Sequence, residues 1–550
     1  ATVSTGGSTT VEFYTTVGPQ IQTYGYGWGV GQWGGTVAGA TTSTINEGGT
    51  FSDSDTTLTL TSAAAFPSSG TIQIGSELIT YSGKSSNDLT GLSRGANGTT
   101  AAAHSNGATV TNASDFSGWG VAVPADQTTL EPGLWSLDNF GEVLIATIAN
   151  GETFTWNAAA TDRLTVRASK STSGFATGNN PTASRLTLVS PTARHLLHFG
   201  TETTIGTAST QDDMFIRFSV QEDINTYTPT STNTAGTLRL QDGTKIVGAL
   251  KAKESILVFT DNALYTMKYI GSPFYFNLEQ VGTNCGLIGR NAAVEVDGVA
   301  YWMSSKGFLL YDGTVKTLPC AVEDEVFDNL DTTKGQQIAA GLNNLFSEIV
   351  WWYPTNSDFN NKAVSYNYAE STGVAGGVWA LSTEARSSWM DAKIYERPYA
   401  TKFDTSGTGT FPTILGESGL GQTKYFQHEI GTDQVNEDGT VTKITSNLKS
   451  YDFEIETQGG GGDVFVSVSR FIPDFKTLNG NSDVTLAIKR FPSQTETSST
   501  NSPFTIDSST TKKDTRARGR YVNLKIENKN VNESWRYGTL MLDVRPDGAR

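Results

Sequence analysis

The stretch Ile256–Met267, ILVFTDNALYTM, contains two short apolar runs separated by a polar turn. Four apolar residues come first, the turn is centred on Asp261-Asn262, and the second run begins at Leu264. Short runs rich in β-branched and aromatic residues on both sides of an Asp-Asn turn predict a β-hairpin. A lone hairpin cannot bury its own apolar face, so this one requires copies or partners elsewhere in the chain.

Similar strand-turn-strand units occur five more times, at intervals of 43 to 65 residues. Recurrence of such a unit at roughly 40–50 residues, with insertions, is typical of the blades of a β-propeller. An array of β-sandwich sheets is the alternative fold. The other units are Val143–Trp156, His195–Ile205, Val299–Gly313, Ile338–Pro354 and Thr413–Gln427, and the six anchoring residues are Leu144, Leu196, Ile256, Val299, Ile349 and Ile414.

Composition favours the same fold class. A chain of 550 residues suggests roughly three or four domains, or fewer if one is a large all-β unit. Thr, Ser, Gly and Val are abundant, which favours many short strands. One segment, Ala321–Leu330, predicts a helix because Val322, Val326 and Leu330 are spaced by four residues; its acidic residues are interpreted as a solvated face.

The chain divides into four expected regions. Residues 1–50 are rich in glycine and aromatic residues, and Thr23–Gly35 is either a loop with exposed aromatic side chains or an arm that contacts a neighbouring subunit. Residues 51–115 predict a small inserted β module with a hairpin around Gly75-Ser76. Residues 116–440 contain the repeated units and predict the β-propeller.

Residues 441–550 have regular alternating strands and predict a β-sandwich-like C-terminal region. From Thr511 to Arg550 there are ten Lys and Arg against five Asp and Glu. This local excess is either interleaved surface charge or a patch that docks on an acidic neighbour or borders a DNA path.

The formal net charge of the chain is −16. Binding to nucleic acid relies on Lys and Arg, so this charge argues against a nucleic-acid-binding outer surface. An acidic wall would instead let DNA slide past without adhering, although solubility alone also explains the charge. No apolar run approaches the ~20 residues that span a bilayer. Cys285 and Cys320 are expected to be free thiols, with a single disulfide as the alternative.

Residues suited to catalysis or metal binding are few. There are four histidines, and His195 and His198 lie three apart in a predicted strand, so they should point to opposite faces. No P-loop, GxSxG or HExxH motif is present. We therefore expect no metal and no cofactor.

A glycosidase built on a propeller would use two carboxylates. Glu222-Asp223 and Asp212-Asp213 are the candidates in this sequence. Acidic residues at turns are common on the surface of such a fold, so we expect a protein that is not an enzyme and assign no catalytic residues.

Segments between Asp212 and Leu330 resemble the β-propeller of the nozzle proteins of short-tailed bacteriophages, also called tail tubular protein B or tail hub proteins. The segments are MFIRFSVQEDINTYTPTSTNTAGTLRL, ILVFTDNALYTMKYIG and NCGLIGRNAAVEVDGVAYWMSSKGFLLYDG. The last strands, VSRFIPDF, RARGRYVNLKIE and GTLMLDVRPDG, resemble the C-terminal part of the same proteins. The resemblance covers Leu134–Arg550, and the N-terminal region departs from it through its inserted module.

The resemblance implies a homohexameric ring in the virion tail, below the portal and its adaptor, made in the host cytoplasm. Such a ring retains packaged genomic DNA, conducts it during ejection without sequence-specific binding, and offers outer surfaces to tail fibres or spikes. Loops that join β elements are the expected gate. The alternative is a receptor- or glycan-binding tail protein, in which Trp28 and Trp33 would stack on sugars.

Overall fold

The computed structural model is almost wholly β, with 49% of residues in strands and 4% in helices. The chain forms two compact units: the first comprises Ala1–Ile394 and Tyr399–Phe426, and the second Tyr395–Pro398 and Gln427–Arg550. The expected boundary before residue 441 thus differs from the observed division. The structure describes residues 2–5, 9–12, 41–96, 99–113, 134–157, 180–253, 255–357, 359–404, 422–436, 439–454, 464–498 and 502–548.

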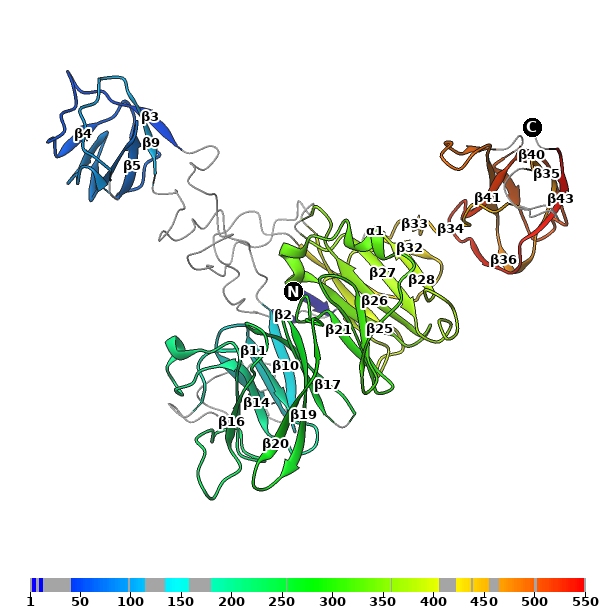
Figure 1. Ribbon diagram of the computed structural model, residues 1–550, viewed down its shortest axis with the longest axis horizontal. Helices are drawn as coiled ribbons and strands as arrows, with labels where there is room; N and C mark the ends of the chain where they lie inside the picture. The colour runs from blue at the N-terminus through cyan, green and yellow to red at the C-terminus, as the bar shows by residue number, and fades with distance from the viewer. Residues whose placement is uncertain are drawn as a thin grey trace. The chain divides into compact units, whose positions relative to one another are not determined.

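Six antiparallel sheets follow one another from residue 135 to residue 427, and the strands of each sheet pair in sequence order (Figure 1). Sheet 1 contains β10 (Trp135–Phe140), β11 (Val143–Ile148) and β12 (Thr153–Asn157); sheet 2 contains β13 (Ser184–Val189), β14 (Leu196–Thr201), β15 (Phe215–Phe218) and β16 (Gly236–Arg239). Sheet 3 contains β17 (Ile246–Lys251), β18 (Ile256–Thr260), β19 (Ala263–Gly271) and β20 (Tyr275–Thr283); sheet 4 contains β21 (Ala293–Val296), β22 (Val299–Met303), β23 (Phe308–Tyr311) and β24 (Val315–Thr317). Sheet 5 contains β25 (Ala339–Asn343), β26 (Glu348–Tyr353), β27 (Lys362–Asn367) and β28 (Trp379–Ser382); sheet 6 contains β29 (Ser388–Met390), β30 (Tyr399–Asp404) and β31 (Gln422–Gln427).

The first strand of each sheet is its inner strand, because it lies against the first strand of the next sheet throughout the series. Sheets connected in this way, each a simple up-and-down meander, are the blades of a β-propeller. The predicted all-β fold and its propeller are therefore confirmed.

The inner strands point in one direction. Before β21, the guanidinium of Arg290 donates hydrogen bonds to the carbonyl oxygens of Leu134, which precedes β10, and of Arg185, near the start of β13. At the other end, Nζ of Lys251 in β17 lies 2.7 Å from the carboxylate of Asp138 in β10. We call the end where the inner strands begin the N-face, and the end where they finish the C-face.

The hairpin of Ile256–Met267 is confirmed: β18 and β19 are antiparallel, with Ile256 opposite Met267. Every residue of β18 is buried. Ile256 and Val258 pack in a cluster with sheet 2, whereas Leu257 and Phe259 pack in a cluster with sheet 4. Because alternate side chains enter different sheet interfaces, the strand needs an uninterrupted apolar run.

Five of the six anchoring residues lie on the second strand of their sheet, in β11, β14, β18, β22 and β26, and Ile414 lies outside the described residues. The hairpins expected at Val143–Trp156 and Val299–Gly313 are formed by the second and third strands of sheets 1 and 4. The one expected within Ile338–Pro354 is formed by β25 and β26.

The hairpin expected at His195–Ile205 is wrong. Only β14 forms there, and its partner β15 begins at Phe215. The intervening loop is held by the buried carboxylate of Glu202, which accepts hydrogen bonds from the backbone N–H groups of Gly206 and Thr207. Backbone pairing continues past β14 through the bridge of Glu202 with Gln211 and the bond from the N–H of Thr203 to the carbonyl oxygen of Thr210, so the chain turns back only after Thr203.

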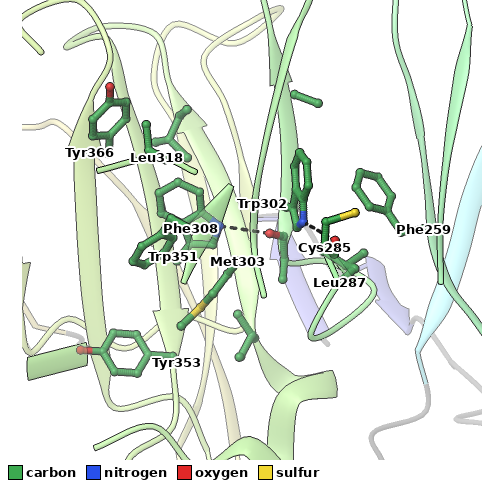
Figure 2. Close-up of a cluster of buried hydrophobic side chains, with 14 of the residues drawn as sticks. Phe259, Cys285, Leu287, Trp302, Met303, Phe308, Leu318, Trp351, Tyr353 and Tyr366 are labelled. Atoms are coloured by element: carbon green, nitrogen blue, oxygen red, sulfur yellow. Dashed lines mark hydrogen bonds between the residues drawn. The ribbon is translucent and has the colours of Figure 1, made fainter. Parts of the chain in front are cut away.

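Tryptophan indoles connect neighbouring parts of the propeller core (Figure 2). Nε1 of Trp302 in β22 donates to the carbonyl oxygen of Cys285 at 2.9 Å. Nε1 of Trp351 in β26 donates to the carbonyl oxygen of Ala292 at 3.1 Å and so joins sheet 5 to the start of sheet 4. The ring of Trp351 also packs on Phe308, with centroids 4.8 Å apart. Each indole therefore fills space and satisfies a buried carbonyl.

We expect Trp351→Ala to reduce the stability of the propeller by about 3–5 kcal/mol, because it leaves a cavity and an unpaired carbonyl. Urea unfolding followed by far-UV circular dichroism measures the shift. Leu381→Ala, at a 46% exposed position on the edge strand of sheet 5, is the matched control and should shift the midpoint little. Equal shifts in the two variants would contradict the assigned role of Trp351.

The inserted module is a small β unit with its own core (Figure 1). Its strand β3 pairs with β9, so the module begins before residue 51, the expected boundary. The hairpin expected around Gly75-Ser76 is formed by β5 and β6. One sheet has the order β3 (Thr42–Thr44), β9 (Thr109–Asn112), β5 (Gly70–Ile74) and β6 (Glu77–Tyr81), and the other β4 (Thr57–Thr59), β8 (Asp88–Thr90) and β7 (Gly83–Ser85).

A buried carboxylate, Glu77, organises the long loop of this module. It accepts hydrogen bonds from Nε and Nη2 of Arg94, both at 2.8 Å, and from the backbone N–H groups of Gly95 and Ala102. Nε2 of His104 lies 2.8 Å away. Burial opposes ionisation of Glu77, but these hydrogen bonds outweigh it and lower its pKa to about 2.

We expect Glu77→Gln to destabilise the module at neutral pH, since a buried guanidinium loses its counter-charge. The stabilisation from a lowered carboxylate pKa is complete above the unfolded value of 4.5 and is lost as the pH falls towards 2. Hydrogen exchange of the β5 and β6 amides in the full chain should therefore differ between wild type and variant at pH 7 and converge near pH 2. A difference independent of pH would exclude this role.

The second unit contains the predicted sandwich-like region, whose core unites residues of two larger sheets and of the two-stranded sheet of β36 and β42. Strands β1 (Thr2–Thr5) and β2 (Thr9–Glu12), near the N-terminus, belong to the first unit and pair with each other. The strands of the second unit are β32 (Asp433–Val435), β33 (Val441–Lys443), β34 (Asn447–Lys449), β35 (Val466–Ile472), β36 (Phe475–Asn479), β37 (Ser482–Lys489), β38 (Thr497–Ser498), β39 (Phe504–Ile506), β40 (Lys513–Gly519), β41 (Tyr521–Asn528), β42 (Ser534–Tyr537) and β43 (Met541–Pro546).

The predicted helix is present but short. Helix α1 (Glu323–Phe327) occupies the middle of the expected segment, and its Val326 is buried. The 3-10 helices η3 (Ala208–Thr210) and η4 (Thr332–Gln337) lie in loops of the propeller. No helix in the described ranges is long and apolar enough to cross a membrane.

Candidate functional site

The N-face of the propeller axis is occupied by arginine side chains. Arg290 reaches the backbone of sheets 1 and 2, as described above. Nε of Arg185 donates to the carbonyl oxygen of Ile246 at 2.8 Å, and its Nη1 pairs with Asp213 at 3.2 Å. The neighbouring Asp212 pairs with Arg239 at 2.7 Å. The guanidinium groups of Arg290 and Arg185 tie blades together, whereas Arg239 pairs with Asp212 within the blade of sheet 2.

The two carboxylate pairs named from the sequence are not brought together. Asp212 and Asp213 lie on the N-face side of β15, whereas Glu222 lies beyond its other end and pairs with Arg194 at 2.7 Å. A glycosidase needs its acid and its nucleophile or base on either side of one bond. The length of β15 separates these candidates, so they do not form such a pair with each other.

The histidines point to opposite faces of sheet 2, as predicted. His195 precedes β14 and packs between Phe218 and Phe276, with Nδ1 2.7 Å from the carbonyl oxygen of Ser219. Burial lowers its pKa. Its position among aromatic rings indicates a role in packing.

His198 lies on the other face of sheet 2 and is fully buried. Its Nδ1 is 2.9 Å from Oγ of Ser184, and its Nε2 is 3.2 Å from the hydroxyl of Tyr227. Burial, and then the charge of Arg217, lower the pKa of His198 to about 3. The neutral imidazole is thus held in a polar network inside the blade.

The C-face carries an open pocket of about 560 Å³ lined by Lys251, Ala252, Lys253, Glu295, Asp297 and Gly298. The ammonium of Lys251 is engaged by Asp138, and Oε1 of Glu295 accepts the N–H of Gly298 at 2.7 Å. Charges of both signs line this pocket. Of these, Lys251 forms an ion pair with Asp138, and Glu295 is hydrogen-bonded to the backbone. The described ranges contain no group of three or more His, Cys, Asp and Glu arranged to hold a metal ion.

Exposed apolar tips on the C-face are a feature that the sequence analysis missed. The β19–β20 hairpin exposes Ile270 and Phe274, the latter to 75%. The β25–β26 hairpin exposes Leu345 and Phe346, and the loop after β29 exposes Ile394. Apolar residues within turns of the sequence were the signal that could have identified these tips. Trp28 and Trp33, proposed to stack on sugars, lie outside the described residues.

The negative charge of the chain is not evenly distributed. Residues 1–133 contain 9 Asp and Glu against 2 Lys and Arg, and residues 134–426 contain 29 against 21, whereas residues 427–550 contain 17 against 16. The predicted excess of Lys and Arg after Thr511 is partly used inside the second unit: Arg518 pairs with Asp547, and Lys525 with Glu527. The propeller segment is therefore acidic, and the second unit is nearly neutral.

Cys285 and Cys320 are both free.

Comparison with models of protein families and with curated proteins gives no match to this chain. Solved structures that align with this chain include the computationally designed Ika8 protein, at 11% identity over 66% of this chain and 94% of that one, with a TM-score of 0.29. BamB from Moraxella catarrhalis aligns at 12% identity over 66% and 97%, with a TM-score of 0.24. A glycoside hydrolase aligns at 11% over 72% and 95%, also with a TM-score of 0.24. The propeller assignment rests on the strand pairing of this chain.

In the unfolded chain His198 has a pKa of 6.5, whereas in the folded protein its pKa is about 3. Between these values the unfolded chain therefore binds a proton that the folded protein does not bind. The stability that it contributes is therefore complete above pH 6.5 and is lost as the pH falls towards 3. We expect a slope approaching about 1.4 kcal/mol per pH unit from this group. Urea unfolding at pH 7, 6, 5 and 4 measures it.

The control for this measurement is His198→Gln, whose side chain can still hydrogen-bond but does not titrate. The variant should be less stable at pH 7 and show a shallower decline with acid. His195 acts in the same direction, so the variant retains part of the slope. An unchanged slope in the double variant His195→Gln/His198→Gln would refute this assignment.

Proposed function

We propose that this chain is a structural protein of a bacteriophage short tail, a nozzle or hub that retains packaged DNA and conducts it during ejection. The resemblance of the Asp212–Leu330 segments motivates the proposal. The observation that carries it furthest is the excess of negative charge in the propeller segment, where residues 134–426 contain 29 Asp and Glu against 21 Lys and Arg. A rigid β scaffold with an acidic surface suits a conduit for a polyanion.

The mechanism is geometric and electrostatic. Like charges on the wall and on the phosphates repel, so DNA moves past without lasting contacts. At physiological salt this repulsion acts over about 8 Å, which keeps the polymer off a nearby wall. Loops at the ends of the blades would form the gate, because they can move while the sheets stay fixed.

In this proposal the chain assembles as a homohexamer in the virion tail after synthesis in the host cytoplasm. An adaptor near the portal would bind one end of the ring, and tail fibres or spikes its outer surface. The exposed apolar tips Phe274 and Phe346 on the C-face offer contacts for such partners.

A receptor- or glycan-binding tail protein is the second candidate. It is favoured by exposed aromatic side chains, of which Phe274 is 75% and Tyr451 86% exposed. Aromatic rings of this kind stack on sugar faces. Affinity for host glycans that Phe274→Ala or Tyr451→Ala abolishes would support this candidate.

Native mass spectrometry tests the first candidate directly, and we expect six copies. Electron microscopy of virions should then place the chain on the tail axis. A monomer or trimer with affinity for host glycans, located at the tail periphery, would overturn the nozzle proposal in favour of the second candidate.

The charge argument has its own test. Wild-type protein should not retain linear duplex DNA on a filter at 50 mM salt. Neutralising three exposed acids of the propeller segment, Glu279→Gln, Asp297→Asn and Glu323→Gln, should produce retention that is lost by about 200 mM salt. The matched control neutralises three acids of the second unit and changes net charge equally.

The control variant combines Asp507→Asn, Asp514→Asn and Asp547→Asn. We expect it to retain less DNA than the propeller variant. Equal retention by the two variants would show that total charge, rather than its position on the propeller, keeps DNA from adhering.

A further inference from the structure

Strands β19 and β20 form an arm that extends past the rest of sheet 3. Strand β18 pairs with β19 only as far as Met267, whereas β19 continues for four more residues, to Gly271. A strand rises about 3.4 Å per residue, so the hairpin extends about 13 Å beyond β18. Its tip exposes Ile270 and Phe274. We call residues 268–277 the β19–β20 arm.

The base of this arm packs on sheet 2 through four aromatic rings. Tyr269 and Phe276 lie opposite each other in the arm. The centroid of the His195 ring lies 5.9 Å from that of Tyr269, 5.2 Å from that of Phe276 and 5.8 Å from that of Phe218 in β15. We call these four residues the His195 cluster. Its imidazole contacts all three other rings and therefore joins the arm to sheet 2.

The hydrogen bonds of His195 define its tautomer. Nδ1 lies 2.7 Å from the carbonyl oxygen of Ser219, so this nitrogen carries a hydrogen and donates it. In the neutral ring Nε2 is then the unprotonated nitrogen, and it has no hydrogen-bond partner among the described residues. The side chain is fully buried. A second proton, on Nε2, would therefore place a charged donor in apolar surroundings, which is unfavourable.

The charged side chains around the cluster do not compensate for such a proton. On sheet 2, Arg194 and Glu222 pair with each other at 2.7 Å. Glu222 raises the pKa of His195, but burial lowers this pKa by more. The arm contributes Lys268, an exposed cation next to Tyr269. Aromatic rings attract cations, yet the hydration that a buried imidazolium loses is the larger effect. The closed cluster therefore holds the neutral imidazole.

We propose that His195 makes the contact between the β19–β20 arm and sheet 2 sensitive to acid. The neutral imidazole holds the arm on sheet 2. Protonation at Nε2 separates the two, because the charged ring regains its hydration only when the arm moves away. The exposed tip with Phe274 then moves relative to the blade, while the pairing of β18 with β19 is retained. This device belongs to the blade itself and does not depend on the proposed nozzle.

The direction of the pH dependence follows from linkage. A hydrated imidazole has a pKa of 6.5, and burial lowers the pKa of His195 when the arm is closed. The closed arm is therefore fully favoured above pH 6.5, and this advantage is lost as the pH falls below that value. Because opening takes up one proton, closure weakens by up to about tenfold per pH unit.

Hydrogen exchange of the full-length protein between pH 7.5 and 4.5 tests the proposal. Protection factors, which correct for the intrinsic pH dependence of exchange, are compared for the β19–β20 arm and for the β25–β26 hairpin, which contains no histidine. We expect the arm to lose about tenfold or more of its protection, while the β25–β26 hairpin keeps its own. Equal losses in the two hairpins would mean that acid loosens the whole propeller and would overturn the proposal.

Two variants that do not titrate assign the effect to His195. His195→Asn keeps a donor for the carbonyl oxygen of Ser219, and His195→Phe keeps a ring in the cluster. The protection of the arm in both should be independent of pH, and His195→Phe should keep the arm closed throughout. His198→Gln, which removes the other buried histidine of sheet 2, should respond to acid as wild type does. Acid-induced loss in both His195 variants, or none in His198→Gln, would refute the assignment.

The mobility of the tip provides a second measurement. Phe274→Cys is labelled with a pH-insensitive fluorescent maleimide in protein carrying Cys320→Ser, since Cys285 is buried. We expect the anisotropy of the label to fall between pH 7.5 and 4.5 and to stay constant when His195→Phe is added. Thr314→Cys, at the β23–β24 turn on the same C-face, is the matched control and should not change. Constant anisotropy at the tip with His195 present would show that the arm stays closed in acid, against the proposal.

Discussion

The structure depends on strands that bury both of their faces. In β18 the side chains alternate between two hydrophobic clusters, so that Val258 contributes to packing with sheet 2 and Phe259 to packing with sheet 4. Burying large apolar side chains contributes about 1.5–3 kcal/mol each, and this gain exists only when a sheet lies on either side. Each blade therefore requires the next.

Buried polar groups set the loops where the apolar packing stops. Glu202 and Glu77 are carboxylates buried among hydrogen-bond donors, and each fixes a loop through bonds from backbone N–H groups. Such groups are costly to bury unless every acceptor is used, so they specify one loop conformation. His198 acts similarly between Ser184 and Tyr227. The apolar interfaces thus give the propeller its stability, and these networks give its connections their shape.

The sequence predicted the blades because the signal for a doubly buried strand is local. A run such as ILVF before a polar turn identifies the second strand in five sheets. The hairpin expected within His195–Ile205 was wrong, because the chain after β14 forms a longer loop that the contacts of Glu202 hold. The candidate carboxylates at Asp212 and Glu222 could have been separated from sequence, since the FIRF strand lies between them. The contacts of Glu202 could not, because they depend on which backbone N–H groups the folded loop brings to its carboxylate, and no local pattern records that.

Blade packing and conduction would depend on different forces in this protein. The clusters between blades are apolar, and removing apolar area from water depends little on moderate salt. Repulsion between an acidic wall and DNA is instead screened, with a range of about 10 Å at 0.1 M salt and about 3 Å at 1 M. A propeller built in this way keeps its blades together while ionic strength changes how closely DNA approaches its wall. Separation of the two forces follows from where the chain places its charged side chains and where it buries its apolar strands.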